Sequence, residues 1–237
     1  MADLVIDIGN TALKAAWCDG MTLGKTFRYQ GERMFEFIIS LVEKVRPEKI
    51  VLSSVRTFSD KNISRLKKEC SVLIVLADIM MSKYDIPSYI TPDRAASIIA
   101  SRYLFKNREC MIFDFGTTLS VDFIDDKGKY EGGNVSLGCR TRFKALNRYS
   151  KVLPLVDVPE DYKEMGNSLK GSLESGVLSG IIFEIEGYMS RHPRKLSVFT
   201  GGDAIYFAKR MKNSIFVACN LVLMGLALIA FEYDKKD

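Results

Sequence analysis

The chain has 237 residues, 47% of them hydrophobic, which is enough for one large globular domain or two of ordinary size. Its 34 basic and 29 acidic residues give a net charge of +5 and are spread along the chain, so we expect no nucleic-acid partner, whereas an anionic small molecule is compatible. Five cysteines without paired spacing, and a start without a signal-peptide pattern, predict a reduced, cytoplasmic protein. A single histidine and the lack of C-x-x-C argue against a zinc site.

Three antiparallel strands are predicted at the start of the chain. A buried strand runs to Asp7, a tight turn follows, and an extended pattern resumes at Leu13. The dipeptide Asp19-Gly20 then suits the positive backbone angles of a hairpin turn. The next segments predict, in order, a helix, a strand, a helix capped by Ser59 and a strand: "RMFEFIISLVEKVR", "KIVLSSV", "SDKNISRLKKEC" and "SVLIVLA".

The pattern of strand, tight turn and strand begins again at "CMIFDFGTTLSVDF". Its turn "DFGTT" (114–118) aligns residue for residue with "DIGNT" (7–11). We interpret this as an internal duplication, which predicts two domains, 1–108 and 109–237. Near the end, "KLSVFTGGDAIYFAKRM" predicts a strand that ends at a Gly-Gly pair and turns into a helix.

The segment 215–231 is nearly all apolar and approaches the length of a membrane span. Asn220 and Gly225 interrupt it, and Lys212 and Asp234 flank it closely. A helix that is apolar all round can also be the central helix of a globular core. We therefore expect a core helix and no membrane partner.

The two turns carry features that suit phosphate binding. A glycine lets the backbone approach a ligand closely, and adjacent amides with Thr or Asn side chains offer hydrogen-bond donors to phosphate oxygens. Lys14 adds a cation near the first turn. The chain contains neither a P-loop nor a G-x-G-x-x-G motif. Two such turns and the Gly-Gly entry to a helix predict a nucleotide held between two domains, the alternative being two plain hairpin turns.

The motifs "DIGNT", "DFGTT" and "TGGD", in this order on a duplicated frame, resemble those of the sugar kinase/Hsp70/actin superfamily. Within it, the chain resembles type III pantothenate kinases from end to end, with "YDIPSYITPDR", "GGNVSLG", "SGVLSGIIFEIEGY" and "NLVLMGL" matching further family motifs. The resemblance implies an α/β protein with a duplicated actin-like ATPase fold (ribonuclease H-like), in which two similar domains enclose a cleft. It also identifies the apolar segment as a core helix.

The resemblance implies ATP-dependent phosphorylation of pantothenate to 4'-phosphopantothenate, the first step of coenzyme A biosynthesis. The enzyme would be a homodimeric kinase, a phosphotransferase with an alcohol group as acceptor. Four positions depart from the family pattern: Thr91, Leu137, Leu169 and Met224. These departures keep open a non-catalytic regulatory protein of the same fold, of the Bvg accessory factor type, and less strongly another kinase or sugar-binding regulator of the superfamily.

Asp93 is the candidate catalytic residue. It lies in the first turn of the predicted helix "PDRAASIIASRYLF", which Thr91 would cap with Pro92 at the first position, so it could simply stabilise a helix terminus. The resemblance implies instead that its carboxylate accepts the proton of pantothenate's hydroxyl during attack on the γ-phosphate of ATP. Arg94 would pair with the substrate carboxylate. The full substrate site implied is Tyr84, Thr91, Pro92, Asp93, Arg94 and Leu169, with Ser168 a possible source of the hydroxyl that Leu169 lacks.

The resemblance also assigns the nucleotide and cation sites. A carboxylate at the second turn cannot itself attract phosphate, so Asp114 is expected to hold a cation, and the resemblance implies K⁺ or NH₄⁺ there. Mg²⁺ would travel with ATP, with Asp7 orienting it through water and Lys14 assisting the phosphates. The residues implied to bind ATP are Asp7, Ile8, Gly9, Asn10, Thr11, Ala12, Leu13, Lys14 and Thr117.

Overall fold

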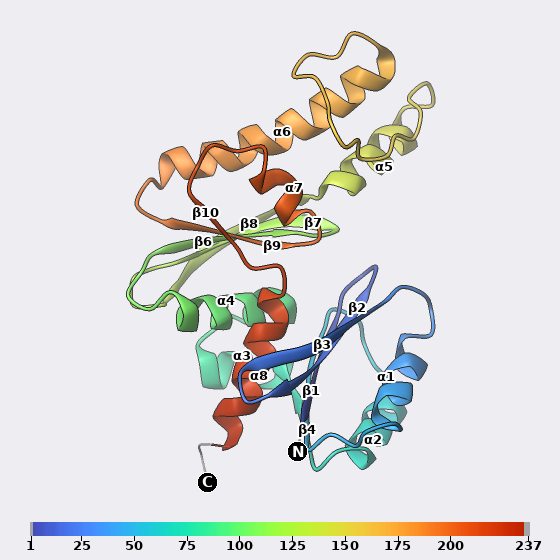
Figure 1. The fold of residues 1–237 in the computed structure, drawn as a ribbon, viewed down its shortest axis with the longest axis vertical. Coiled ribbons are helices and arrows are strands. Elements are labelled where there is room, and N and C mark those ends of the chain that lie inside the picture. The colour runs from blue at the N-terminus through green and yellow to red at the C-terminus, as the bar shows by residue number, and fades with distance from the viewer. Residues whose placement is uncertain (1, 235–237) are drawn as a thin grey trace. The chain divides into compact units, whose positions relative to one another are not determined.

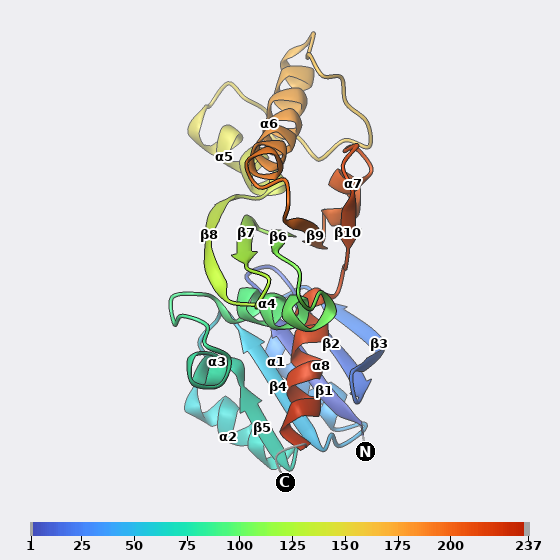
Figure 2. The same cartoon turned by 90° about the vertical axis from the view of Figure 1, so that its left-hand side faces the viewer.

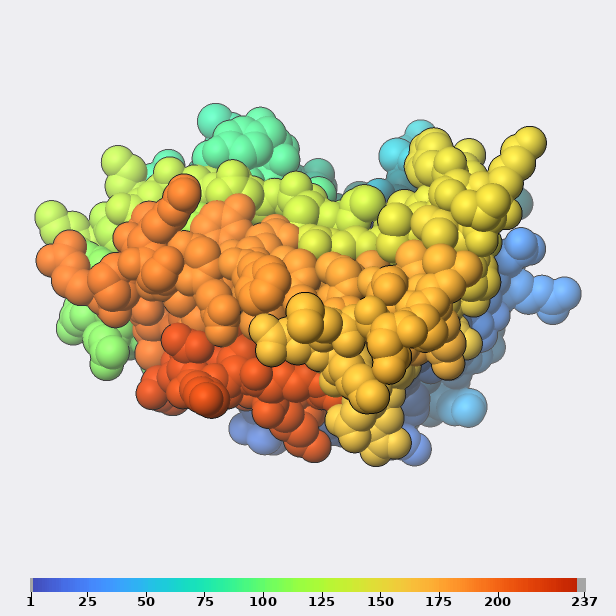
Figure 3. Space-filling view, turned by 90° about the horizontal axis from the view of Figure 1, so that it is seen from above, coloured from blue at the N-terminus to red at the C-terminus, as the bar shows by residue number. Residues whose placement is uncertain are grey.

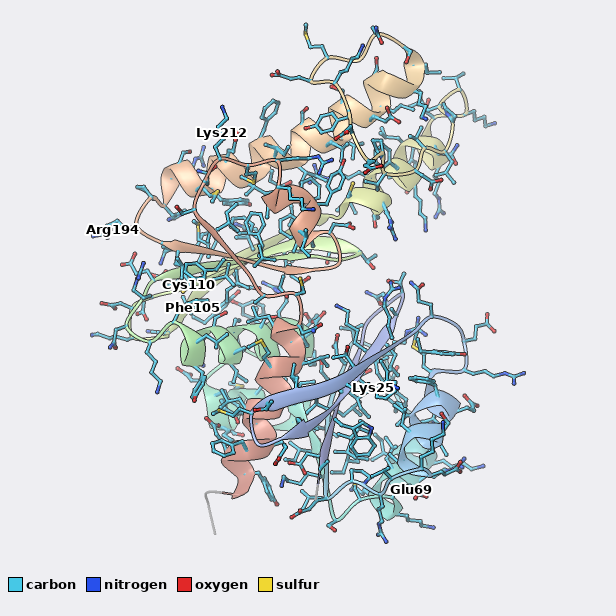
Figure 4. All side chains as sticks on the ribbon, viewed as in Figure 1. Lys25, Glu69, Phe105, Cys110, Arg194 and Lys212 are labelled. Carbon is cyan, nitrogen blue, oxygen red and sulfur yellow. The ribbon has the colours of Figure 1, made fainter. Side chains whose placement is uncertain are left out.

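The computed structural model describes residues 2–234, which form two units, each built on a five-stranded mixed sheet (Figure 1). The first unit takes the chain up to Lys106 and again from Asn220, and the second takes Asn107–Cys219. The charged side chains of Arg194 and Lys212 lie at the outer surface of the second unit, as Figure 4 shows.

The first unit has the strand order β3-β2-β1-β4-β5, in which β1 pairs antiparallel with β2 and parallel with β4. Its strands are β1 (Asp3–Ile8), β2 (Leu13–Asp19), β3 (Thr22–Tyr29), β4 (Lys49–Ser54) and β5 (Val72–Val75). Its helices are α1 (Met34–Val42), α2 (Asp60–Lys68), α3 (Leu76–Tyr84), α4 (Pro92–Leu104) and α8 (Leu221–Asp234).

The second unit repeats this frame with the order β8-β7-β6-β9-β10, and β6 again has one antiparallel and one parallel neighbour. Its strands are β6 (Cys110–Phe115), β7 (Thr118–Ile124), β8 (Tyr130–Leu137), β9 (Leu196–Gly201) and β10 (Ile215–Val217). Its helices are α5 (Cys139–Tyr149), α6 (Leu169–Arg191) and α7 (Ala204–Ala208). The shared strand order confirms the predicted duplication.

Two elements of the first unit differ from their predicted form. Helix α1 ends at Val42, and Val45, which continues the apolar spacing, is exposed. The segment "SVLIVLA" is a strand only as far as Val75, because Leu76 begins α3. The Ser59 cap of α2 is confirmed, since its Oγ accepts a hydrogen bond of 3.3 Å from the backbone N–H of Asn62.

The predicted core helix is confirmed as α8, which packs against α4 and against β1 and β4 of the first sheet (Figures 1 and 2). Every side chain from Leu226 to Ala230 is buried. Among the residues described, no helix is long and apolar enough to cross a membrane. The chain therefore returns to its first unit from Asn220 onward. The domains predicted from the sequence, 1–108 and 109–237, had placed this last segment in the second unit.

Gly225 permits the close contact between α8 and α4. A Cβ atom at this position would lie 2.0 Å from the carbonyl oxygen of Ala96 and 2.7 Å from its carbonyl carbon. These are backbone atoms of a packed helix, so they cannot move aside as the end of a side chain could. Only glycine fits here without separating the two helices.

Four phenylalanine rings hold the second unit together behind its turn. Phe115 lies 4.8 Å from Phe199 and 5.1 Å from Phe207, measured between ring centroids, and Phe113 lies 5.3 Å from Phe199. These contacts join β6, β9 and α7. Since Phe115 directly follows Asp114, the same packing fixes the strand end that carries this carboxylate.

Replacing Gly225 by Ala should destabilise the protein although alanine favours helix. We expect overpacking to cost about 1 to 3 kcal/mol of unfolding free energy and to lower the thermal midpoint. Gly187→Ala in α6 is the matched control, because no atom lies within 4 Å of its added Cβ, and it should stabilise by about 0.5 to 1 kcal/mol. Thermal unfolding by circular dichroism compares them, and equal midpoints for the two variants would contradict the packing argument.

Candidate phosphate turns and the substrate helix

The first turn joins β1 to β2 through the four residues from Gly9 to Ala12. The backbone N–H of Gly9 donates to the carbonyl of Ala12 at 3.0 Å and closes the loop. A Cβ on Gly9 would lie only 3.3 Å from that carbonyl oxygen, so glycine keeps the turn tight. Asn10 and Thr11 are exposed at its tip. The turn thus presents backbone amides and two polar side chains to solvent, which is the arrangement that binds phosphate oxygens.

Asp7 lies at the base of the first turn between two neighbouring strands. Lys14 is its cross-strand partner on β2, and Ser53 is its partner on β4. The buried hydroxyl of Ser53 donates to Oδ1 of Asp7 at 3.0 Å. Because directly paired residues project to the same face of a sheet, Lys14 and Asp7 present an ammonium and a carboxylate on one side of the turn.

Arg56 also contacts the first turn, a position that was not predicted from the sequence. Its guanidinium Nη2 donates to the carbonyl oxygen of Asn10. In the sequence, Arg56 is marked only as a basic residue directly after "SSV" at the end of a strand. This position predicts a place beside the first turn only when β4 is known to pair with β1. The first turn therefore has two basic side chains beside it, Lys14 and Arg56.

The second turn is one residue shorter than the first. The backbone N–H of Gly116 donates to the carbonyl of Thr118 at 2.9 Å, and β6 and β7 pair again from Phe115 and Leu119. The residue-for-residue alignment of "DFGTT" with "DIGNT" is therefore wrong after the glycine. By strand pairing, Ser120 occupies the position opposite Asp114 that Lys14 occupies opposite Asp7, whereas the residue-for-residue alignment would place Val121 there.

Asp114 lies between Ser120 on β7 and Thr200 on β9, so its neighbours across the sheet carry hydroxyl groups. Gly201 adopts a φ of +92°, and a Cβ there would lie 2.4 Å from Oδ1 of Asp114 and 2.6 Å from the backbone N of Phe115. Glycine at 201 thus permits its backbone to pack closely against the carboxylate. A carboxylate flanked by two hydroxyl-bearing residues offers oxygen ligands, so the chemistry of these residues fits the predicted K⁺ or NH₄⁺.

Thr117 is held in place by contacts to its carbonyl. The backbone N–H of Gly138 and the hydroxyl of Thr141 donate to this oxygen at 3.0 and 2.6 Å. A Cβ on Gly138 would lie 2.1 Å from the carbonyl oxygen of Gly116, so this glycine permits a close approach of backbone to the turn. The neighbouring Leu137, one of the four departures, is exposed.

The Gly-Gly entry to α7 completes the second turn. The backbone N–H of Gly202 donates to the carbonyl of Phe115 at 2.9 Å. Burial raises the pKa of the Asp203 carboxyl that follows, although the positive charge of Arg140 opposes the shift. Burial likewise raises the pKa of the Cys139 thiol to about 12, so this cysteine stays uncharged and is no nucleophile at neutral pH.

Asp93 lies in the first turn of α4, as predicted, and is partly exposed. Its Oδ1 accepts a hydrogen bond of 2.9 Å from the backbone N–H of Arg94. Pro92 stands at the first helical position, but the predicted cap is wrong in one respect: Thr91 has cap backbone angles and its side chain makes no capping hydrogen bond. The contact of Asp93 is compatible with a helix-terminus role and leaves the second carboxylate oxygen for other partners.

Tyr84 has structural contacts at the opposite end of α4. Its hydroxyl donates to Oε2 of Glu232 on α8 at 2.9 Å, and Arg102 Nη1 donates to its carbonyl at 2.6 Å. Burial, followed by the Glu232 carboxylate, raises the pKa of the Tyr84 phenol. Arg102 is nine residues beyond Asp93, about 13 Å along a helix at 1.5 Å per residue. These contacts explain the position of Tyr84 without any bound ligand. Its place in the substrate site stays a prediction.

Leu169 begins α6 and is exposed, in the second unit. Ser168, considered as a replacement hydroxyl, is the N-cap of this helix, and its Oγ accepts a hydrogen bond of 3.1 Å from the backbone N–H of Gly171. Its oxygen therefore already serves the helix as an acceptor. Met224, the remaining departure, lies on α8 in the first unit and is partly buried.

Comparison with proteins of known fold supports the architecture. The chain superimposes on an activator of 2-hydroxyisocaproyl-CoA dehydratase from Clostridium difficile with a TM-score of 0.62 at 16% identity, covering 100% of this chain and 96% of the other. A conserved protein of Campylobacter jejuni, described as of the Baf family of transcriptional activators, gives 0.66 at 22% identity, covering 98% and 99%. A ROK hexokinase from Thermus thermophilus gives 0.56 at 14% identity over the whole of both chains. These likenesses confirm the actin-like ATPase fold.

Sequence relatives identify the family. A type III pantothenate kinase of Azobacteroides pseudotrichonymphae is 33% identical over 240 aligned positions, covering 98% of this chain and 97% of the relative. One of Cytophaga hutchinsonii is 34% identical, covering 94% and 96%. The family profile itself matches residues 3–191. With the duplicated sheet, the two glycine turns and these matches, the chain belongs to the type III pantothenate kinase family.

Proposed function

We propose that this protein transfers the γ-phosphoryl group of ATP to pantothenate, forming 4'-phosphopantothenate in the first step of coenzyme A biosynthesis. Family membership over almost the whole chain supports this activity. The structural observation that carries it is the pair of glycine turns at equivalent strand ends, one flanked by basic side chains and the other by a carboxylate. The likeness to the Baf family protein, at 22% identity, concerns the fold alone and does not favour the regulatory alternative.

In this mechanism Asp93 is the general base. Its carboxylate takes the proton of the pantothenate hydroxyl as that oxygen attacks the γ-phosphorus, and the bond from phosphorus to the β,γ-bridging oxygen breaks to release ADP. The hydrogen bond from the Arg94 backbone to Oδ1 orients the carboxylate, and Oδ2 would then face the substrate. Arg94 would bind the carboxylate of pantothenate through its planar guanidinium.

The two turns would stabilise the charge of the nucleotide in different ways. The amides of the first turn and Lys14 would bind the triphosphate, with Mg²⁺ arriving on ATP and supplying charge neutralisation of the phosphates. Asp7, held by Ser53, would orient the magnesium through water. Asp114 would hold K⁺ or NH₄⁺ at the second turn, and Thr117, held through its carbonyl, would contact ATP.

A homodimer is supported by an apolar surface on the second unit. Figure 3 shows the side of the second unit formed by α5, α6 and the chain between them, in yellow and orange. Large apolar side chains of these segments are exposed: Tyr149, Val152, Leu155, Met165, Leu169 and Phe183. A pocket of about 620 Å³ between the two helices lies beside them. Several large exposed apolar side chains on neighbouring segments are characteristic of protein interfaces, and a second copy of the chain is the occupant we propose.

A cytoplasmic location is also proposed. All five cysteines are free thiols in the structure, and four of them are buried. Thiols persist in a reducing compartment, which is where a kinase that draws on cellular ATP operates.

Asp93→Asn should abolish turnover while ATP still binds. The amide oxygen can still accept the Arg94 N–H, so the helix end keeps its hydrogen bond and only the base is lost, which typically reduces the rate about 100- to 10,000-fold. The matched control is Asp78→Asn, which removes a carboxylate from the first turn of α3. Pantothenate-dependent ADP release measures both, and thermal unfolding reports their stability.

If Asp93 only stabilised the end of the helix, the expected activity of the Asp93→Asn protein would be the opposite. Both variants would then lose about 0.3 to 1 kcal/mol of unfolding free energy and keep their activity. If the unmodified protein releases no ADP in response to pantothenate, the kinase proposal fails and the regulatory alternative is favoured.

Asp114→Asn should raise the ATP concentration needed for half-maximal rate and remove the stimulation by K⁺, because the cation loses its charged ligand. Asp126→Asn, an exposed carboxylate in the turn between β7 and β8 of the same unit, should retain the full response. The measurement is ADP release at varied ATP with K⁺, NH₄⁺ or Na⁺ as the cation. Full K⁺ stimulation in a folded Asp114→Asn protein would exclude this site.

The protein should have a mass of twice 26.7 kDa by light scattering at micromolar concentration. Val152→Glu places a charge in the apolar surface and should shift the mass toward that of one chain. Val45→Glu, the same change at an exposed valine of the first unit, should leave the dimer intact. A single-chain mass for the unmodified protein would refute the dimer, and an undiminished mass for Val152→Glu would place the interface elsewhere.

A further inference from the structure

Arg56 lies beside the first turn because β4 is the parallel neighbour of β1. The pairing continues one residue past the strand, since the backbone N–H of Val55 donates to the carbonyl of Ile8 at 3.0 Å. Arg56 is the next residue, so its position follows from the same hydrogen-bond ladder that ends at the turn.

The backbone at Arg56 is fixed by Ser54. The hydroxyl of Ser54 accepts a hydrogen bond of 3.0 Å from the N–H of Arg56 and lies 2.8 Å from the carbonyl of the same residue, to which it can donate. These two contacts give the backbone at Arg56 local hydrogen bonds in place of the sheet ladder. The side chain then reaches the turn, where Nη2 donates to the carbonyl of Asn10.

One carbonyl oxygen does not neutralise a guanidinium. Arginine keeps its positive charge at all physiological pH values and carries five N–H donors, of which the bond to Asn10 uses one. The residue is exposed, so its remaining donors are accessible at the tip of the turn. A planar cation beside exposed backbone amides is an arrangement that binds phosphate oxygens.

The duplicated frame supplies an internal comparison. In the second unit the backbone N–H of Gly202 donates to the carbonyl of Phe115, just as the N–H of Val55 donates to the carbonyl of Ile8 in the first. Asp203, the residue after Gly202, therefore occupies the position equivalent to Arg56, the residue after Val55. The basic residues Lys14 and Arg56 of the first turn thus correspond to Ser120 and Asp203 of the second. The first turn therefore has two basic side chains at positions where the second turn has a neutral hydroxyl and a carboxyl, and this difference favours an anion at the first turn.

We infer that Arg56 binds an anionic oxygen of the ATP triphosphate at the first turn, as a binding residue additional to the turn amides and Lys14. The bond to Asn10 holds the guanidinium in place before the nucleotide arrives, which reduces the entropy lost on binding. The inference rests on the proposed function for the identity of the nucleotide, but its chemistry requires only a polyphosphate.

The test measures binding separately from activity. Titration calorimetry with the Mg²⁺ complex of a non-hydrolysable ATP analogue, and separately with AMP, is applied to the unmodified protein, Arg56→Ala, Arg56→Gln and Arg56→Lys. Loss of a charged hydrogen bond should weaken analogue binding about 10- to 100-fold for Ala and Gln, less for Lys, while AMP binding stays unchanged. Arg65→Ala, which removes an exposed arginine that pairs with Glu43, controls for net charge.

Arg56→Gln distinguishes a ligand role from a structural one. Its amide retains an N–H for the Asn10 carbonyl and lacks the charge, so analogue affinity equal to that of the unmodified protein would overturn the inference. A loss that Arg65→Ala reproduces would also overturn it, because the effect would be one of overall charge. If the protein binds the analogue through Arg56 but shows no pantothenate-dependent ADP release, the proposed function fails and the inference stands.

Discussion

The central strand of each sheet determines where the chemistry can take place. Both β1 and β6 pair antiparallel on one side and parallel on the other, so three segments meet at the strand's carboxyl end: the strand itself, the tight turn into the antiparallel neighbour, and the residues that follow the parallel neighbour. A glycine N–H closes each turn. Asp7 and Asp114 therefore occupy equivalent places, each with one partner on either side.

The equivalent strand ends of the two units carry side chains of different charge. Around Asp7 the partners are Lys14 and Ser53, with Arg56 reaching the turn tip, whereas around Asp114 they are Ser120 and Thr200, with the partly buried Asp203 beyond. A phosphate requires cations and amides, and a monovalent cation requires oxygen atoms. On the function proposed here, one duplicated frame would thus supply two kinds of site through different residues at paired positions and a second turn that is one residue shorter.

Helix α8 shows how much the first unit depends on a segment distant in sequence. Its apolar side chains fill the space against α4 and β1, and Gly225 allows the backbones of α4 and α8 to approach. Helix α4 carries Asp93 at its start and receives Tyr84 at its other end, where the Tyr84 hydroxyl is bound by Glu232 of α8. The position of the proposed base is consequently coupled to the packing of the final helix.

Local patterns in the sequence indicated most of the elements, the duplication and the two turns, although not α3 or the length of the second turn. Apolar runs predict the strands, "DIGNT" and "DFGTT" mark the strand ends, and Pro92 marks the start of α4, because each depends on the intrinsic preferences of neighbouring residues. The family motifs added the candidate base, the cation site and the substrate residues, which geometry alone does not assign.

Only the tertiary structure decided which distant residues meet. The pairing of β4 with β1 brought Ser53 to Asp7 and Arg56 to Asn10, and the shorter second turn placed Ser120 opposite Asp114. Packing of α8 assigned the last segment to the first unit and gave Tyr84 a partner in Glu232. Strand register and helix packing arise from the burial of many side chains at once, so no window of the sequence contains them, and a single residue such as Arg56 carries no local sign of its partner.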